Sequence, residues 1–130
     1  MTLPALDQQF LDDRQIEYRV ESENGMICVV LPSWQLPPGL NTTETDVLLR
    51  LPTGYPDIAP DMWWVAPDVR RADGAEIPAT QVTEQCLGRT WQRWSRHFQP
   101  GQWQSGVDGL ESFFALIRSE FLTAAGARAA

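Results

Sequence analysis

The residues best suited to chemistry are gathered in one stretch, Thr83 to Trp103, with the sequence TEQCLGRTWQRWSRHFQPGQW. It contains Cys86, half of the six tryptophans, and His97, which is the only histidine of the chain. Cysteine is the one side chain here that is strongly nucleophilic without a dedicated base. Because tryptophans bury a large area and their N–H groups need partners, we expect an ordered, irregular segment packed on a core. The working hypothesis is that the fold presents Cys86.

The two cysteines lie in different sequence surroundings. Cys28 falls within Met26–Leu31, a continuous apolar run, so we expect it to be buried and inert. Cys86 lies in a polar Gln-Cys-Leu-Gly turn, which favours an accessible thiol, although a small buried hydrophobic residue is the alternative. Nearby positive charge lowers the pKa of a thiol. The groups close enough in sequence to supply that charge are Arg89, Arg93, Arg96 and His97.

His97 and Ser95 are the other residues with chemical potential in this stretch. An imidazole can accept the proton of an attacking amine, with Glu84 and Asp108 as alternative bases. His97 equally fits a structural histidine that holds the tryptophan-rich segment by hydrogen bonds. Ser95 and His97 share a face of an extended chain, so Ser95 is a second candidate nucleophile. An ester on Ser95 would need stronger activation than a thioester on Cys86.

Length and charge restrict the classes of protein. A chain of 130 residues fits a single domain, residues 1–130. A net charge of −7 argues against a surface for nucleic acid or an anionic membrane. No apolar run approaches the roughly 18 residues that span a bilayer, and the N-terminus does not resemble a signal peptide. Two cysteines without an export signal indicate reduced thiols and a cytoplasmic protein.

Neither a metal nor a cofactor is expected. One histidine and two distant cysteines do not complete a metal-ligand set. All ten basic side chains are arginine, and the chain has no lysine. Codon bias explains such a composition, and so does a protein that carries an activated acyl group, because a lysine amine would intercept it.

Hydrophobic periodicity and turn signals predict an α+β fold. Apolar residues at helical spacing predict helices over residues 4–13 and 109–123. Alternating or continuous apolar runs predict four strands, at residues 16–21, 26–31, 43–51 and 62–65. Asn24-Gly25 is a strong hairpin signal. Strands joined in sequence without helical crossovers predict an antiparallel meander.

This order of elements, with three local matches, resembles the ubiquitin-conjugating enzyme (UBC) superfamily. LPTGYPDIAPDMWW (Leu51–Trp64) is similar to the Tyr-Pro and Pro-Pro segment of that family. Cys86-Leu87 takes the place of its catalytic Cys-Leu pair, and Trp103 precedes the last helix as in its tryptophan-containing loop. The stretch Trp91–His97 looks like the divergent bacterial members, often encoded beside an activating enzyme and a ubiquitin-like protein.

The resemblance implies a UBC-like fold with an N-terminal helix, a four-stranded meander, a long irregular active-site segment and a C-terminal helix. It also implies that Cys86 accepts a ubiquitin-like protein from an activating enzyme as a thioester and passes it to an amine of a target protein. His97 would be the second catalytic residue. The alternatives are a non-catalytic module of the same fold, which binds a ubiquitin-like protein or an activating enzyme, and an unrelated α+β scaffold.

One departure from the family pattern concerns the oxyanion. The eukaryotic members have a His-Pro-Asn element shortly before the cysteine, and its asparagine supports the oxyanion. Here the nearest counterpart is Ile77-Pro78-Ala79. The candidate stabilisers are therefore His97, Arg89, Arg96 or backbone N–H groups.

Overall fold

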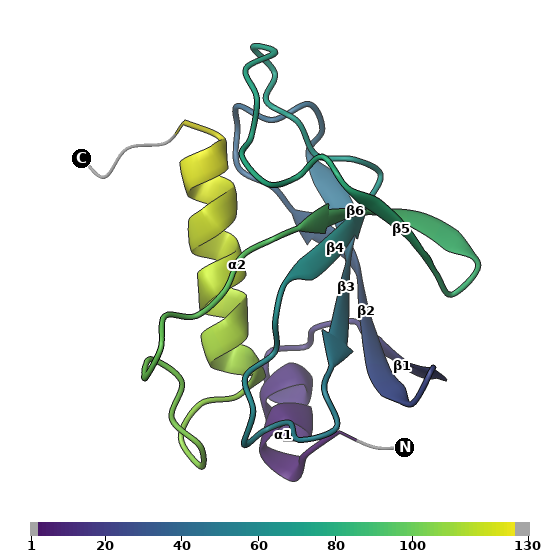
Figure 1. Cartoon of the computed structure of the whole chain (residues 1–130), viewed down its shortest axis with the longest axis vertical. Helices are drawn as coiled ribbons and strands as arrows, with labels where there is room; N and C mark the ends of the chain where they lie inside the picture. The colour runs from purple at the N-terminus through teal and green to yellow at the C-terminus, as the bar shows by residue number, and fades with distance from the viewer. Residues whose placement is uncertain (1–2, 127–130) are drawn as a thin grey trace.

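The fold is α+β, with two helices and one curled six-stranded antiparallel sheet (Figure 1). It is seen in a computed structural model that describes residues 3–126. The helices are α1 (Ala5–Asp13) and α2 (Leu110–Ala124). The strands are β1 (Arg19–Glu23), β2 (Met26–Gln35), β3 (Glu44–Leu51), β4 (Trp63–Ala66), β5 (Thr83–Cys86) and β6 (Arg89–Trp94). Their order across the sheet is β1-β2-β3-β4-β6-β5.

Both helices lie where the sequence pattern predicts them, and the first four strands lie near their predicted positions, although β1 begins three residues later than expected and β2 ends four residues later. The turn between β1 and β2 contains two residues, Asn24 and Gly25, with φ of 53° and 78°. Positive φ at both positions is what a tight hairpin turn requires, and Asn-Gly adopts it readily. The turn sets Glu23 opposite Met26, and every later pair of the hairpin follows from that register.

The expectation of a four-stranded sheet followed by a long irregular segment is wrong. Residues 83–94 form the β5–β6 hairpin, and β6 continues the sheet by pairing with β4, with Trp63 opposite Trp94. The β5–β6 turn is Leu87-Gly88, with φ of 53° and 73°. The sequence indicated a Gln-Cys-Leu-Gly turn, but a leucine in the left-handed region is unusual, so the pattern did not identify this turn as that of a hairpin.

The hydrophobic pattern of β6 was uninformative because both of its faces are covered. Trp91 and Gln92 are neighbours that point to opposite faces, and both are buried. The Gln92 side chain is fully bonded: Oε1 accepts the Val69 N–H at 2.9 Å, and Nε2 donates to the Thr80 carbonyl at 3.1 Å. Burying an amide costs little free energy when all its hydrogen bonds are made. Gln92 can therefore occupy a core position although it is polar.

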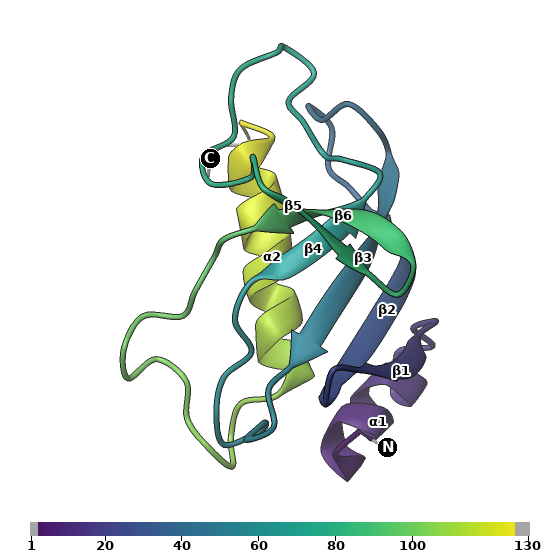
Figure 2. The same ribbon diagram turned by 45° about the vertical axis from the view of Figure 1, so that its right-hand side comes forward.

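The two faces of the sheet carry separate apolar clusters. One face packs against α2 through aromatic side chains, with Trp94 and Phe121 ring centroids 4.9 Å apart. The other face is covered by the β5–β6 hairpin, which crosses the sheet on the side away from α2 (Figure 2). This second cluster consists of Cys28, Val30, Leu48, Trp64, Ala66, Cys86 and Trp91. The curl of the sheet therefore encloses Cys86 rather than presenting it.

The two helices touch at the start of α2, in the lower part of Figure 1. Within residues 3–126, neither helix has the length and apolar character needed to cross a membrane.

Candidate active site

Cys86 is the last residue of the edge strand β5, directly before the Leu87-Gly88 turn. Its exposed fraction is 3 %, so the expected accessible thiol is a buried one in this structure. The strand explains the difference. Side chains alternate along β5, with Thr83 and Gln85 exposed and Cys86 turned inward onto the second cluster.

The charge around Cys86 also differs from the expectation. Burial, and then a hydrogen bond to the Glu23 carboxylate, raise the pKa of the Cys86 thiol to about 12. The three arginines near it in sequence are all paired with carboxylates: Arg89 with Asp46 at 2.8 Å, Arg93 with Glu84 at 2.9 Å, and Arg96 with Glu120 at 2.6 Å. Arg50, on β3, lowers the pKa of the thiol by a smaller amount. We call this conformation closed because Cys86 is buried in it. The raised pKa means that the closed conformation keeps the Cys86 thiol protonated.

Glu23 is the residue at this site that sequence reasoning missed. It ends β1, and its Oε2 accepts the backbone N–H of Leu87 at 2.8 Å, while its carboxylate also raises the pKa of the Cys86 thiol. The tips of the β1–β2 and β5–β6 hairpins thus meet at one carboxylate. No sequence signal pointed to it, because the two tips are brought together only by the curl of the sheet.

Cys28 lies beside Cys86, although the two are far apart in sequence. Cys28 is fully buried on β2, as expected, and both cysteines belong to the second cluster. Burial raises the pKa of Cys28 as well. Both cysteines are free.

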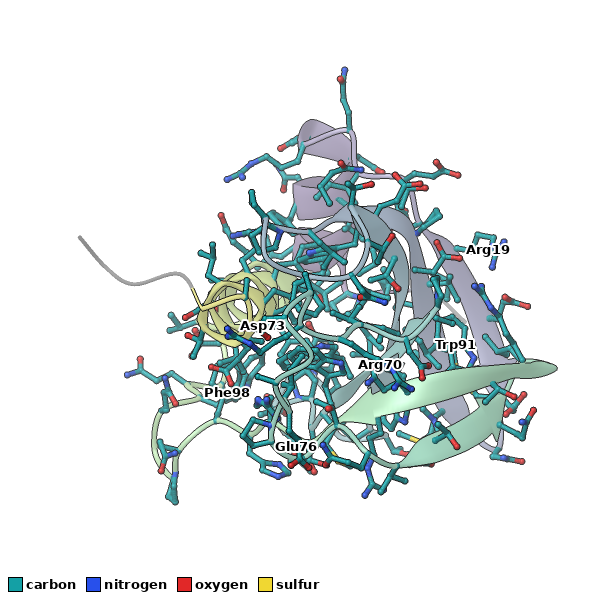
Figure 3. All side chains as sticks on the ribbon, turned by 90° about the horizontal axis from the view of Figure 1, so that it is seen from above. Arg19, Arg70, Asp73, Glu76, Trp91 and Phe98 are labelled. Carbon is teal, nitrogen blue, oxygen red and sulfur yellow. The ribbon has the colours of Figure 1, made fainter. Side chains whose placement is uncertain are left out.

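His97 does not lie at this site. It follows the far end of β6, while Cys86 lies opposite Arg89 at the start of that strand, and β6 spans about 17 Å at roughly 3.3 Å per residue. In Figure 3, Trp91 of β6 and Phe98 lie on opposite sides of the view, with Phe98 on the side of α2. The His97 Nδ1 atom contacts the Asp61 carboxylate, and both side chains are exposed.

The structure also places Ser95 and the two arginines that were candidates for stabilising the oxyanion. Ser95 is half-buried, and its backbone N–H donates to the carbonyl of Ala79 at 3.1 Å. Arg89 and Arg96, candidates for the oxyanion, are engaged in the ion pairs given above. Among residues 3–126, no group of three or more histidine, cysteine, aspartate or glutamate side chains is arranged to hold a metal ion.

One known protein family matches the region that contains both helices and all six strands of the described chain. A model described as prokaryotic E2 family E matches residues 3–124, from two residues before α1 to the end of α2. The chain belongs to this family. Membership of an E2 family indicates a role in the conjugation of ubiquitin-like proteins. Cys86 lies inside the matched region. Comparisons with curated proteins and with solved structures found no match.

Proposed function

We propose that the family E protein accepts a ubiquitin-like protein from an activating enzyme as a thioester on Cys86 and transfers it to an amine of a target protein. The observation that carries the proposal is the position of Cys86 at the tip of a two-stranded hairpin, within a chain of the E2 family. Cys28 has no such position, because it lies on β2 between two neighbouring strands.

Both steps of the proposed reaction are acyl transfers. In the first, the Cys86 thiolate attacks the carbonyl carbon of the thioester on the activating enzyme, and the enzyme's own thiolate leaves. In the second, the nitrogen of the target amine attacks the new thioester, the amine gives its proton to a base, and Cys86 leaves as thiolate. A thiolate is required at the first step and is a good leaving group at the second.

Loading requires β5 and the Leu87-Gly88 turn to move away from the second cluster, because Cys86 is buried against that cluster. Such a movement is physically accessible. Among the described strands β5 is an edge strand that pairs with β6, so β5 and the turn after it can separate from the second cluster while β6 stays paired with β4. Local openings of this kind draw on the least stable elements of a fold.

The proposal assigns the base of the second step to His97. Asp61 contacts its Nδ1 atom and would hold a proton there, which leaves the other ring nitrogen free to accept one from an amine. Because β6 separates His97 from Cys86 in the closed form, this assignment requires the hairpin to change position when the target binds.

The test is loading with the activating enzyme, ATP and the cognate ubiquitin-like protein. We expect a covalent adduct that disappears with excess thiol, is absent in Cys86→Ala, and persists in the matched variant Cys28→Ala. Since the chain has no lysine, a thiol-resistant adduct within it is restricted to an ester or to the N-terminal amine. An adduct that survives in Cys86→Ala and is lost in Ser95→Ala would move the chemistry to Ser95.

Two further outcomes would change the proposal. Absence of any adduct, with tight binding of the ubiquitin-like protein retained, would make this a binding module. His97→Ala should slow transfer to amines more than it slows loading. If both steps keep their rates in that variant, the contact between His97 and Asp61 is structural.

A further inference from the structure

The Glu23 carboxylate acts on two neighbouring groups that an acyl-transfer reaction would use: it raises the pKa of a thiol and accepts a backbone N–H. One is the thiol of Cys86, the proposed nucleophile, and the other is the backbone N–H of the next residue, Leu87. In a tetrahedral intermediate, the acyl carbon is bonded to the nucleophile and its oxygen lies 2.7–3.1 Å from the oxyanion donors. Glu23 Oε2 lies 2.8 Å from the Leu87 nitrogen, so a negatively charged oxygen already occupies such a position.

The backbone of the turn explains why this N–H is available. Leu87 and Gly88 are both left-handed, and the pairing of Cys86 with Arg89 closes the turn without using the Leu87 N–H. The residue after the nucleophile supplies an oxyanion donor in other acyl-transfer enzymes, because its N–H lies next to the reacting atom. The half-buried Leu87 side chain packs against the second cluster and anchors the turn.

We propose that the Leu87 N–H is the oxyanion donor for acyl transfer at Cys86, and that Glu23 occupies both the donor and the thiol in the closed protein. Withdrawal of Glu23 then frees the nucleophile and its oxyanion donor in one movement. This inference rests on the proposed function, and it supplies the donor that the missing asparagine leaves open.

The other charged and titratable groups around Cys86 do not replace Glu23 in this position. Cys28 faces it from β2 and Arg50 from β3, while Arg50 is itself 3.7 Å from Glu84 on β5. The Glu84 carboxylate is held by Arg93 on β6 at 2.9 Å. Glu23 is therefore the group that acts on both the thiol and the Leu87 N–H.

The test compares two small reagents on the whole chain in a Cys28→Ala background, where Cys86 is the remaining thiol. Iodoacetamide alkylates the thiolate at a saturated carbon and develops no oxyanion. The ester p-nitrophenyl acetate forms a bond between Sγ and the acyl carbon through a tetrahedral oxyanion, then releases p-nitrophenolate. The ratio of acylation rate to alkylation rate at one pH therefore reports oxyanion stabilisation separately from thiol ionisation.

Glu23→Gln and Glu23→Ala separate the two roles of the carboxylate. The glutamine oxygen can still accept the Leu87 N–H, but the negative charge is gone. We expect both rates at pH 8 to rise about tenfold for each unit by which the pKa of the thiol falls, with their ratio unchanged. In Glu23→Ala the donor is free, and we expect the ratio to rise about tenfold or more, since one oxyanion donor is worth roughly 10²–10³ in rate.

Glu21→Gln is the matched control, because Glu21 lies on the same strand with an exposed side chain. Both rates should stay at the background value in that variant. Should Glu23→Ala fail to fold, Glu23→Thr removes the carboxylate while keeping a residue that favours a strand, and the same rise in the ratio is expected. An equal ratio in Glu23→Gln and in the truncated variant would overturn the proposal, as would a rise of the same size in Glu21→Gln.

The experiment also distinguishes failure of this inference from failure of the proposed function. Neither reagent needs a ubiquitin-like protein. A ratio that rises in Glu23→Ala, together with no adduct in the loading experiment, would remove the proposed function and leave the donor assignment standing. A thioester on Cys86 with an unchanged ratio would remove the donor assignment alone.

Discussion

Tyr55 donates its hydroxyl to Asp7 Oδ2 at 2.6 Å, which ties the loop after β3 to the first turn of α1. The other oxygen of the same carboxylate accepts the Leu110 N–H at 3.0 Å, at the first residue of α2. Asp7 is 5 % exposed. One buried side chain thus satisfies a partly buried hydroxyl and an N–H at the start of α2, where a negative charge is also favoured by the helix dipole.

Replacement of Asp7 should therefore destabilise the fold. Asp7→Ala removes the acceptor at the α2 N-terminus, a loss of about 1 kcal/mol, and leaves the Tyr55 hydroxyl unpaired at a further cost of about 1–3 kcal/mol. We expect the free energy of unfolding in urea to fall by roughly 2–4 kcal/mol. Asp12→Ala, an exposed position on the same helix, is the control and should change it by less than about 0.5 kcal/mol. Equal effects of the two variants would contradict the capping role.

Gly109 should tolerate no larger side chain for a reason that also involves Asp7. Its φ of −159° suits any residue, but a Cβ atom there would lie 2.6 Å from Asp7 Oδ1. We expect Gly109→Ala to cost about 1–3 kcal/mol in urea unfolding, as overpacking does. The cost should shrink in an Asp7→Ala background, because the clashing oxygen is absent. Additive effects of the two substitutions would place the strain elsewhere.

Both thiols should react slowly in the native protein, although the sequence favoured an accessible Cys86 and a buried Cys28. We expect a bulky thiol reagent to label neither Cys28 nor Cys86 quickly in the native protein, since both are buried. Cys86 should be labelled first as urea is added, because opening of the edge hairpin exposes it before global unfolding exposes Cys28. Mass spectrometry after cleavage at arginine separates the two thiols. Native labelling of Cys86 at the rate of the unfolded chain would contradict its burial.

Stability should decline at high pH because of Cys86. Burial raises the pKa of this thiol from its ordinary value of 9.0 to about 12, so the folded state holds the proton more tightly than an unfolded chain does. The contribution is complete below about pH 9 and is lost as the pH rises toward 12, with a slope of at most about 1.4 kcal/mol per pH unit. Urea unfolding between pH 8 and 11 should show a steeper decline for the native chain than for Cys86→Ala. Parallel declines would mean that the folded protein leaves the thiol unperturbed.

Much of the scaffold was predictable, because its signals are local. Alternating apolar residues identified the first four strands, and helical spacing identified both helices within about one residue of the observed α1 and α2. The Asn24-Gly25 turn was identified for the same reason. Residues 83–94 escaped prediction because β6 is covered on both faces and turns through a left-handed leucine.

The sequence by itself determined the family and the chemical inventory: two cysteines, one histidine, no lysine, and a hairpin-linked sheet closed by a helix. Only the tertiary structure decided which of those groups meet. The curl of the sheet brings Glu23 and Cys28 to Cys86, and the length of β6 holds His97 away from it. The accessibility and ionisation of a thiol depend on what surrounds it in space, and the contact between Glu23 and Leu87 joins residues 64 positions apart. No local pattern encodes a contact of that range.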